Sequence, residues 1–413
     1  MKTAVAIGIV LTLLAAVARG EDPLDRVDDA LTWSLGPSVR AHVSGTADAE
    51  GYALPDPAPG VIDAVGSLLF NPRVTTFLDV QLGQSVYAFA QVRIDRGFDP
   101  SNDPLRARLD EYAVRWAIDG RGRINLQVGK FATVVGNWTE RHGSWTDPFI
   151  TAPLPYENLT GVWDTEPPHS AGQLLVWSHV RPGLPAAVTE DEKYRRLPIL
   201  WGPDYATGAA VAGDIGQFNY AFEVKNASLS SRPETWSPET THWEYPTVSG
   251  RIGWRPDESW GIGWSASSGS FLRPEADPLI PAAYRRGDYR EEVLAQDVSF
   301  AWHHVQLWAE VFAARFTVPP VGDADSVAYY LEAKYKFTPQ FFAAVRWNQQ
   351  LFGTVPNRGI DVRWGQDTWR WDVAPTYRFT PHLQLKLQYS LQRGNTDNDR
   401  LTHFFATQAT LRF

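Results

Sequence analysis

The chain has 413 residues and a formal net charge of −9; 44% of its residues are hydrophobic, 13% are aromatic and none is cysteine. Without cysteine there can be no disulfide scaffold, thiolate metal site or cysteine nucleophile. The acidic balance argues against a nucleic-acid-binding surface, and the hydrophobic content is too high for a disordered chain.

The N-terminus has the pattern of an export signal. Lys2 precedes an apolar run, residues 3–18, that is too short to span a membrane as a helix, and the small residues near Ala18 and Gly20 fit a cleavage site. We therefore expect residues 1–20 to be a cleaved signal peptide and residues 21–413 to form one exported domain. An uncleaved anchor is the alternative, but no charged stop-transfer flank follows the apolar run.

Beyond the signal, apolar and polar residues alternate with a period of two in segments of about ten residues, as in 217–225 and 383–392. This alternation predicts β-strands. The expected strands are 38–46, 72–82, 85–95, 107–118, 123–131, 158–164, 172–180, 205–213, 217–226, 247–255, 259–268, 291–302, 305–316, 325–336, 340–350, 367–378, 383–393 and 401–413. There are eighteen, or sixteen if the weakest two, 38–46 and 158–164, are omitted.

The connections between these strands alternate between short turns and long polar loops, and aromatic residues recur at the ends of the apolar faces. Apolar and polar residues also alternate along the strands of a soluble β-sandwich, but a sandwich does not combine alternating loop lengths with aromatic residues at the ends of the apolar faces. We therefore predict an all-β fold: a transmembrane antiparallel β-barrel of 16–18 strands with short periplasmic turns and long extracellular loops.

Two segments resemble known bacterial proteins. The last predicted strand ends at Phe413. This terminal aromatic residue resembles the one that the assembly machinery recognises at the end of bacterial outer-membrane barrels. Residues 128–136, VGKFATVVG, resemble the V-G-K-F-x-T-P-x-G segment of phosphate-selective porin O/P-type proteins, with Val134 in place of the proline. The resemblance implies a porin, and no substrate-binding residue is carried over from it.

In such a barrel the inward face carries the function. On this face basic residues outnumber acidic ones, and rings of arginine or lysine favour anions. The predicted pore-lining and selectivity residues are Arg93, Arg115, Arg346, Arg370, Glu111, Glu332 and Lys334. In the alternative interpretation the opposite charges only pair across strands and stiffen the wall. Residues near the rim of short turns are not expected to take part in a constriction; these are Arg123, Arg255, Arg378 and Arg412.

The loop 132–157 contains aromatic residues that are too apolar for a solvated loop, so we expect it to fold into the barrel as a constriction. Its candidate residues are Trp138, Glu140, Arg141 and Asp147. An exposed, receptor-like loop is the alternative.

These patterns predict a porin in a Gram-negative outer membrane that passes small hydrophilic solutes by diffusion, leaning to anions, with no enzymatic step and no cofactor or metal. The alternatives are a sugar- or substrate-specific channel and an adhesin or receptor that acts through its long loops. Membrane lipids, lipopolysaccharide, the assembly machinery and small solutes are the expected partners; a homotrimer is compatible with this class, and nucleic acid is not expected. Inward aromatic residues could serve a specific channel as stacking surfaces: Tyr87, Phe89, Trp308, Phe312 and Tyr330.

Overall fold

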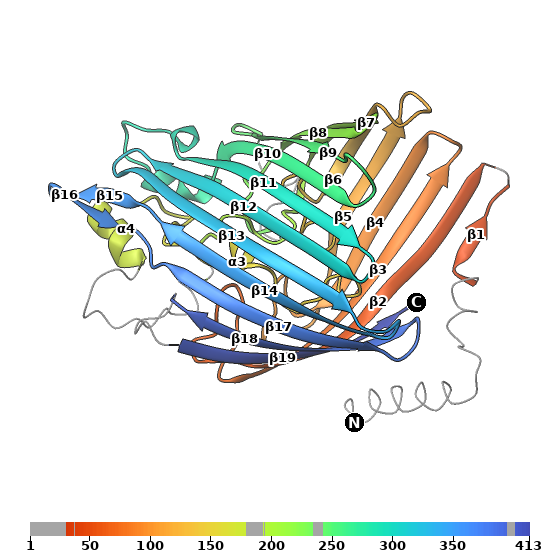
Figure 1. Ribbon diagram of the computed structural model, residues 1–413. Helices are drawn as coiled ribbons and strands as arrows, with labels where there is room; N and C mark the ends of the chain where they lie inside the picture. The colour runs from red at the N-terminus through yellow and green to blue at the C-terminus, as the bar shows by residue number, and fades with distance from the viewer. Residues whose placement is uncertain (1–29, 37, 179–192, 194, 234–242, 395–400) are drawn as a thin grey trace.

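The computed structural model describes residues 30–36, 38–178, 193, 195–233, 243–394 and 401–413. They form a closed antiparallel β-barrel in which each strand pairs with the next and β19 (Leu401–Arg412) returns to pair with β2 (Val39–Ala53) (Figure 1). Sixteen strands close this barrel, namely β2–β14 and β17–β19, as the sequence pattern predicts. The expected signal peptide, 1–20, lies outside the described residues.

The remaining barrel strands follow in chain order. They are β3 (Leu68–Leu82), β4 (Val86–Asp95), β5 (Arg106–Ala117), β6 (Asn125–Phe131), β7 (Ala206–Ile215), β8 (Phe218–Lys225), β9 (Thr247–Trp254), β10 (Trp260–Ser270), β11 (Arg290–Trp302), β12 (Val305–Val318), β13 (Gly322–Lys336), β14 (Phe341–Phe352), β17 (Thr368–Arg378) and β18 (Leu383–Arg393). Outside the barrel circuit, β1 (Thr32–Ser34) pairs with β2, and β15 (Thr354–Asn357) forms a hairpin with β16 (Ile360–Arg363). Short helical segments lie in the connections: α3 (Leu154–Glu157), α4 (Ala171–Trp177), η2 (Pro274–Leu279) and η3 (Arg286–Asp288).

The alternation within each strand separates an apolar exterior from a polar interior. In β18, Gln384, Lys386 and Gln388 are buried, whereas Leu387 between them is exposed on the outside. This is the reverse of a soluble protein, because here the polar side chains point to the centre and the apolar ones to the surroundings. A barrel with this arrangement fits a lipid bilayer.

Two predicted strands are wrong. Segments 158–164 and 172–180 belong to one long connection, residues 132–205, between β6 and β7. In the second, residues 171–177 form helix α4: the Ser170 side chain caps it by accepting a hydrogen bond from the Gln173 amide (3.3 Å), and Leu174 and Leu175 bury one helical face. Residues 179–180 lie outside the described part.

The weak prediction 38–46 is correct, and β2 extends beyond it to Ala53. One connection at the long-loop end departs from the predicted alternation, because only residues 319–321 connect β12 to β13. The other connections alternate as predicted, so one rim carries short turns and the opposite rim carries long loops. We call these the short-turn rim and the long-loop rim. Among the described residues, no helix has the length and apolar character needed to cross a membrane.

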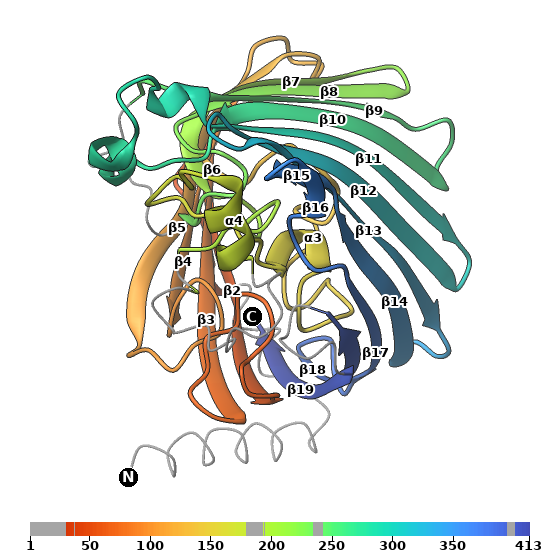
Figure 2. The same cartoon turned by 90° about the vertical axis from the view of Figure 1, so that its left-hand side faces the viewer.

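A hydrophobic cluster lies at the long-loop end of the barrel. Leu174 and Leu175 of α4 pack there with Phe316 of β12 and with Val355 and Trp364 from the β14–β17 connection. Figure 2 shows α3, α4 and the β15–β16 hairpin within or over the ring of strands. The water-accessible part of the interior therefore lies toward the short-turn rim.

Candidate channel lumen

Residues 132–157, which we call the inward loop, run inside the barrel along its wall. The loop enters from the end of β6, and near its tip the Ser144 carbonyl accepts a hydrogen bond from Gln384 Nε2 (2.8 Å) and the Trp145 carbonyl accepts one from Arg378 (3.3 Å). Both partners lie near the short-turn rim. The loop then returns toward the long-loop rim and ends in α3, which lies against β13 and β14 (Figure 2).

The inward loop is stable there because wall side chains satisfy its buried backbone groups, which would otherwise be costly to leave unpaired. Lys386 Nζ donates to the Asp147 carbonyl (2.6 Å). Gln388 Oε1 accepts from the Ile150 amide (2.7 Å). Higher up, Asn348 Oδ1 accepts from the Leu154 amide (3.2 Å). Sequence analysis did not single out these uncharged or singly charged wall residues as anchors, although the alternation places them on the inner face.

Buried charges fix the same stretch of loop to the wall. Arg370 pairs with Glu157 of α3 and with Asp372 (3.0 Å), and Arg346 pairs with Asp372 (2.9 Å) and Glu332 (3.7 Å). All five side chains are at most a few per cent exposed. The expectation that Arg346, Arg370 and Glu332 face the pore is therefore wrong: they lie on the inner face, but the loop covers them. Periodicity identifies the face of a strand and not what lies on top of it.

Three of the four predicted loop residues also turn toward the wall or the loop itself. Trp138 Nε1 donates to Asp147 Oδ2 (2.8 Å), and Arg141 pairs with Glu332 (2.6 Å) while its guanidinium lies 4.5 Å from the centre of the Trp308 ring. Only Glu140 is exposed to the open interior.

Glu310 is a further anchor that sequence analysis missed. Its carboxylate accepts hydrogen bonds from the amides of Asn137 and Trp138 and from Tyr156 Oη (2.6 Å). The loop turns at Gly136, where φ is +79° and where an added Cβ would lie 2.5 Å from Tyr156 Oη. Glycine is required at this turn on both grounds.

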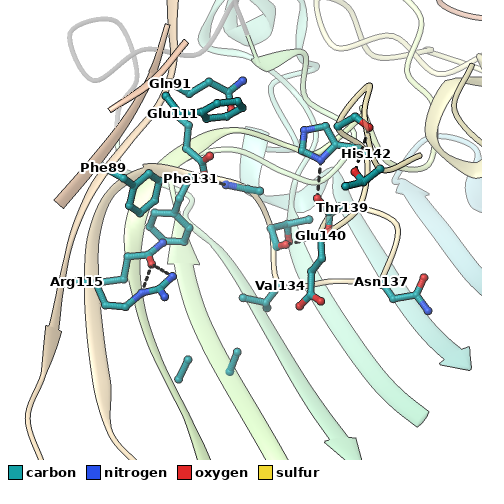
Figure 3. A pocket seen from close by; sticks show the side chains of 18 of the residues that line it. Phe89, Gln91, Glu111, Arg115, Phe131, Val134, Asn137, Thr139, Glu140 and His142 are labelled. Atoms are coloured by element: carbon teal, nitrogen blue, oxygen red, sulfur yellow. Dashed lines mark hydrogen bonds between the residues drawn. The ribbon is translucent and has the colours of Figure 1, made fainter. Parts of the chain in front are cut away.

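A cavity of about 1200 Å³ remains between the inward loop and the wall formed by β2–β11 (Figure 3). Of the predicted wall residues, Arg93, Arg115 and Glu111 line it, but Lys334 does not. The lining includes six arginines and four carboxylates: Arg73, Arg93, Arg115, Arg251, Arg255 and Arg412, with Glu111, Glu140, Asp214 and Asp297.

Half of these arginines are neutralised by carboxylates and half are not. Arg73 pairs with Asp48 and Glu50, Arg93 with Asp95 and Asp110, and Arg251 with Asp297. By contrast, Arg115 binds the neutral Gln127 Oε1 (2.7 Å), and Arg255 and Arg412 make no ion pair within the part of the chain that the structure describes. Three of the lining carboxylates, Glu111, Glu140 and Asp214, also form no ion pair within the described residues, so the cavity presents unneutralised groups of both signs, and arginines outnumber carboxylates in its lining by six to four.

The inward loop adds little positive charge of its own. Burial lowers the pKa of the His142 imidazole, whose Nδ1 lies 2.6 Å from the Thr139 carbonyl and whose Nε2 lies 2.9 Å from Tyr205 Oη. A neutral ring that donates from Nδ1 and accepts at Nε2 satisfies both contacts. Glu140, also on the loop, points into the cavity (Figure 3).

The inward aromatic residues are mostly covered. Phe312 and Tyr330 are fully buried, with Phe312 packed edge-on against Tyr156 of the loop. Tyr87 stacks with Phe89, and of these two only Phe89 lines the cavity. The stacking surface that a sugar-specific channel would need is thus reduced to one ring of the predicted set.

No protein-family model matches this chain, and no curated protein sequence matches it either. Solved structures are similar in fold. Salmonella typhi OmpF, in complex with daunomycin, has a TM-score of 0.57 and 10% identity over 92% of this chain and 100% of its own. An anion-selective porin from Comamonas acidovorans has a TM-score of 0.54 and 8% identity over 91% and 100%. The trimer form of Vibrio cholerae OmpT, an outer membrane protein, has a TM-score of 0.53 and 10% identity over 91% and 100%.

At such low identity these likenesses show the fold alone. The chain has the closed sixteen-stranded antiparallel barrel fold of outer-membrane porins.

Proposed function

We propose that the protein is an outer-membrane porin that passes small hydrophilic solutes by passive diffusion and prefers anions. The observation that carries the proposal is the charged cavity between the inward loop and the β2–β11 wall, enclosed by a barrel whose exterior is apolar. A large closed sheet of this kind encloses an aqueous channel, and such a channel needs no chemical step.

The preference for anions follows from the unpaired arginines. A guanidinium that is already neutralised by a carboxylate contributes little to the field in the lumen, so among the arginines Arg115, Arg255 and Arg412 contribute most to it. The lining carboxylates Glu111, Glu140 and Asp214 oppose them. The fold similarity to an anion-selective porin is in keeping with this proposal. The closer relationship to phosphate-selective porin O/P-type proteins depends only on segment 128–136.

The proposal includes export to the outer membrane of a Gram-negative bacterium and assembly as a homotrimer, the form in which one structurally similar protein is described. Chemical cross-linking of the detergent-folded protein, read by gel electrophoresis, tests the trimer. The adhesin or receptor alternative places the function in the long loops and requires no conductance.

Ion conductance in planar bilayers tests the proposed function. We expect stepwise channel insertion and, in a salt gradient, a reversal potential of the sign that indicates anion preference. Arg115→Gln should move the reversal potential toward zero, because it removes one unneutralised charge from the lumen. Arg315→Gln is the matched control: this arginine lies on the outer side of β12 and pairs with Asp325 (2.7 Å). A cation-preferring wild type, or equal shifts in both variants, contradicts the proposal.

A further inference from the structure

One side of the cavity carries an acid and a base that are held apart on the same strand. Glu111 and Arg115 both lie on the inner face of β5, and both line the cavity. Phe89 of the neighbouring strand β4 lies between them in Figure 3. A second cavity-lining ring, Phe77 of β3, is diagonal to it, because Phe77 pairs with Gln91, two residues from Phe89. We call Glu111, Phe77, Phe89 and Arg115 the wall site.

Neither charge of the wall site is neutralised within the part of the chain that the structure describes. Glu111 Oε1 accepts a hydrogen bond from the Ala132 amide (3.2 Å), and its Oε2 remains available. Arg115 donates from Nε (2.9 Å) and Nη2 (2.7 Å) to Gln127 Oε1, and its Nη1 remains available. The two groups do not pair with each other. A ligand that carries both an ammonium and a carboxylate can therefore form a charge-assisted hydrogen bond at each end.

Other charged side chains around the wall site are already engaged. Asp79 of β3 accepts a hydrogen bond from Tyr87 Oη and does not line the cavity. Arg93 of β4 is paired with two aspartates (3.0 and 3.3 Å). Lys225 Nζ of β8 donates to two backbone carbonyls (2.8 and 2.9 Å). These groups therefore compete little for a ligand that lies between Glu111 and Arg115.

The spacing of the two charges sets the length of a ligand that meets both. The register shift in β5 precedes Glu111, so residues 111–115 run as regular strand. At about 3.4 Å per residue, the Cα atoms of Glu111 and Arg115 are roughly 13 Å apart. Side chains stand roughly perpendicular to a sheet, and Arg115 turns sideways toward Gln127, directly opposite on β6, so this separation is largely kept. Hydrogen bonds of about 2.8 Å at both ends leave roughly 7–8 Å for the ligand.

This length matches a dipeptide. An extended chain spans at most about 3.6 Å per residue, so the termini of a dipeptide are about 7 Å apart, whereas a free amino acid covers half of that distance. The wall is recessed between the two charges, because the inward residue there is Ala113 and its partner on β6 is Gly129. Phe77 and Phe89 are half-buried and offer an apolar surface to a side chain of the ligand.

We propose that the wall site binds zwitterionic dipeptides, with the ammonium at Glu111, the carboxylate at Arg115 and an apolar side chain against Phe89. The inference rests on the proposed function, because it names a class of small hydrophilic solute that the channel selects. A zwitterion has no net charge, so this selection is separate from the preference for anions.

Titration calorimetry of the detergent-folded, full-length protein tests the site without requiring channel activity. The probe is the dipeptide glycylphenylalanine. Free phenylalanine has the same ring but is too short, and the N-acetylated and C-amidated dipeptides each lack one charge. At constant ionic strength, we expect the dipeptide to bind at least tenfold more tightly than each of these three compounds. Equal binding of the dipeptide and free phenylalanine overturns the inference.

Removing a charge from the protein should cancel the effect of removing its partner from the ligand. Glu111→Gln should weaken dipeptide binding tenfold or more, and N-acetylation should then cost less than twofold. C-amidation should keep its full cost in this variant. Arg115→Gln should show the reverse pattern, because it removes the partner of the carboxylate. A general distortion of the wall cannot produce this exchange. An unchanged cost of N-acetylation in Glu111→Gln overturns the inference.

Asp214→Asn is the matched control. It removes a carboxylate that lines the same cavity and forms no ion pair within the described residues, but that lies near the end of β7 at the short-turn rim. Dipeptide affinity within twofold of wild type is expected, and a loss equal to that of Glu111→Gln overturns the inference. Conductance recorded in parallel separates the two proposals. A conducting protein without dipeptide binding refutes only the wall site, and a non-conducting protein that binds the dipeptide refutes only the porin.

Discussion

Replacing Arg370 by glutamine should release the inward loop without unfolding the barrel. Arg370 is 1% exposed and joins Glu157, on the loop, to Asp372, on the wall. Removing one partner of a buried ion pair costs about 3–5 kcal/mol. Asp372 keeps its contact with Arg346, so most of this cost falls on Glu157 and thus on loop docking. Arg370→Gln should therefore shift the equilibrium between docked and released loop toward the released state by roughly 10²- to 10³-fold.

The effect should depend on pH. Burial raises the pKa of the Glu157 carboxyl even with Arg370 in place, and losing the guanidinium raises it further. A carboxyl with a raised pKa favours the docked state while it is protonated and loses that contribution as the pH rises through its pKa. Arg370→Gln should therefore be close to wild type in acid and most perturbed at alkaline pH.

Single-channel recording and limited proteolysis measure the release. At pH 8, Arg370→Gln should show frequent steps to a higher conductance and faster cleavage within 132–157. Glu157→Gln alone should have a smaller effect because Arg370 retains Asp372, and the double variant should be closer to wild type than Arg370→Gln, since no unpaired carboxylate is left. Wild-type gating and protection in Arg370→Gln, or a double variant no better than the single one, would refute the reasoning.

Two further predictions concern the loops. Gly136→Ala should weaken loop docking by about 1–3 kcal/mol, because alanine is strained at a positive φ and its Cβ would collide with Tyr156 Oη. Gly143→Ala, at a position of negative φ in the same loop, is the control and should change docking little. Protection of the loop from protease compares the two variants, and equal effects would contradict the assignment of the turn to Gly136. Burial raises the pKa of the Asp164 carboxyl to about 6 despite its ion pair with Arg273 (3.2 Å). The protonated carboxyl therefore stabilises the folded connection below pH ~4, and this stabilisation, about 3 kcal/mol, is lost as the pH rises from ~4 to ~6. Asp164→Asn should remove this pH dependence from hydrogen exchange in the connection that contains Asp164 and α4, and an unchanged dependence would show that another group titrates.

The barrel itself could be predicted because its period-two pattern is repeated in every strand and is read independently of tertiary contacts. The period-two pattern gave the wrong prediction for segment 171–177, because the apolar content of AGQLLVW is compatible with a buried strand as well as with a helix. The discriminating signal was Ser170, whose side chain caps the helix, together with the i, i+3, i+4 spacing of Ala171, Leu174 and Leu175.

The candidate site was only partly predictable for a related reason. The alternation correctly places Arg93, Arg115 and Glu111 on the inner wall, where they line the cavity. It places Arg346 and Arg370 there too, but whether an inward residue meets water or protein depends on the path of the loop. That path is set by contacts between residues about 200 positions apart, such as Arg346 with the Thr151 carbonyl (2.8 Å).

Single-cysteine labelling tests most directly the central claim that solutes pass between the inward loop and the β2–β11 wall. The chain has no cysteine of its own, so each introduced thiol is the only one. Glu140→Cys places it on the cavity side of the loop, and Gln388→Cys places it beneath the loop, where the native side chain is 2% exposed. A bulky methanethiosulfonate reagent should reduce the single-channel current of Glu140→Cys in one step and leave that of Gln388→Cys unchanged. Complete labelling of Glu140→Cys with no change in current, or equally rapid block of Gln388→Cys, would contradict the account.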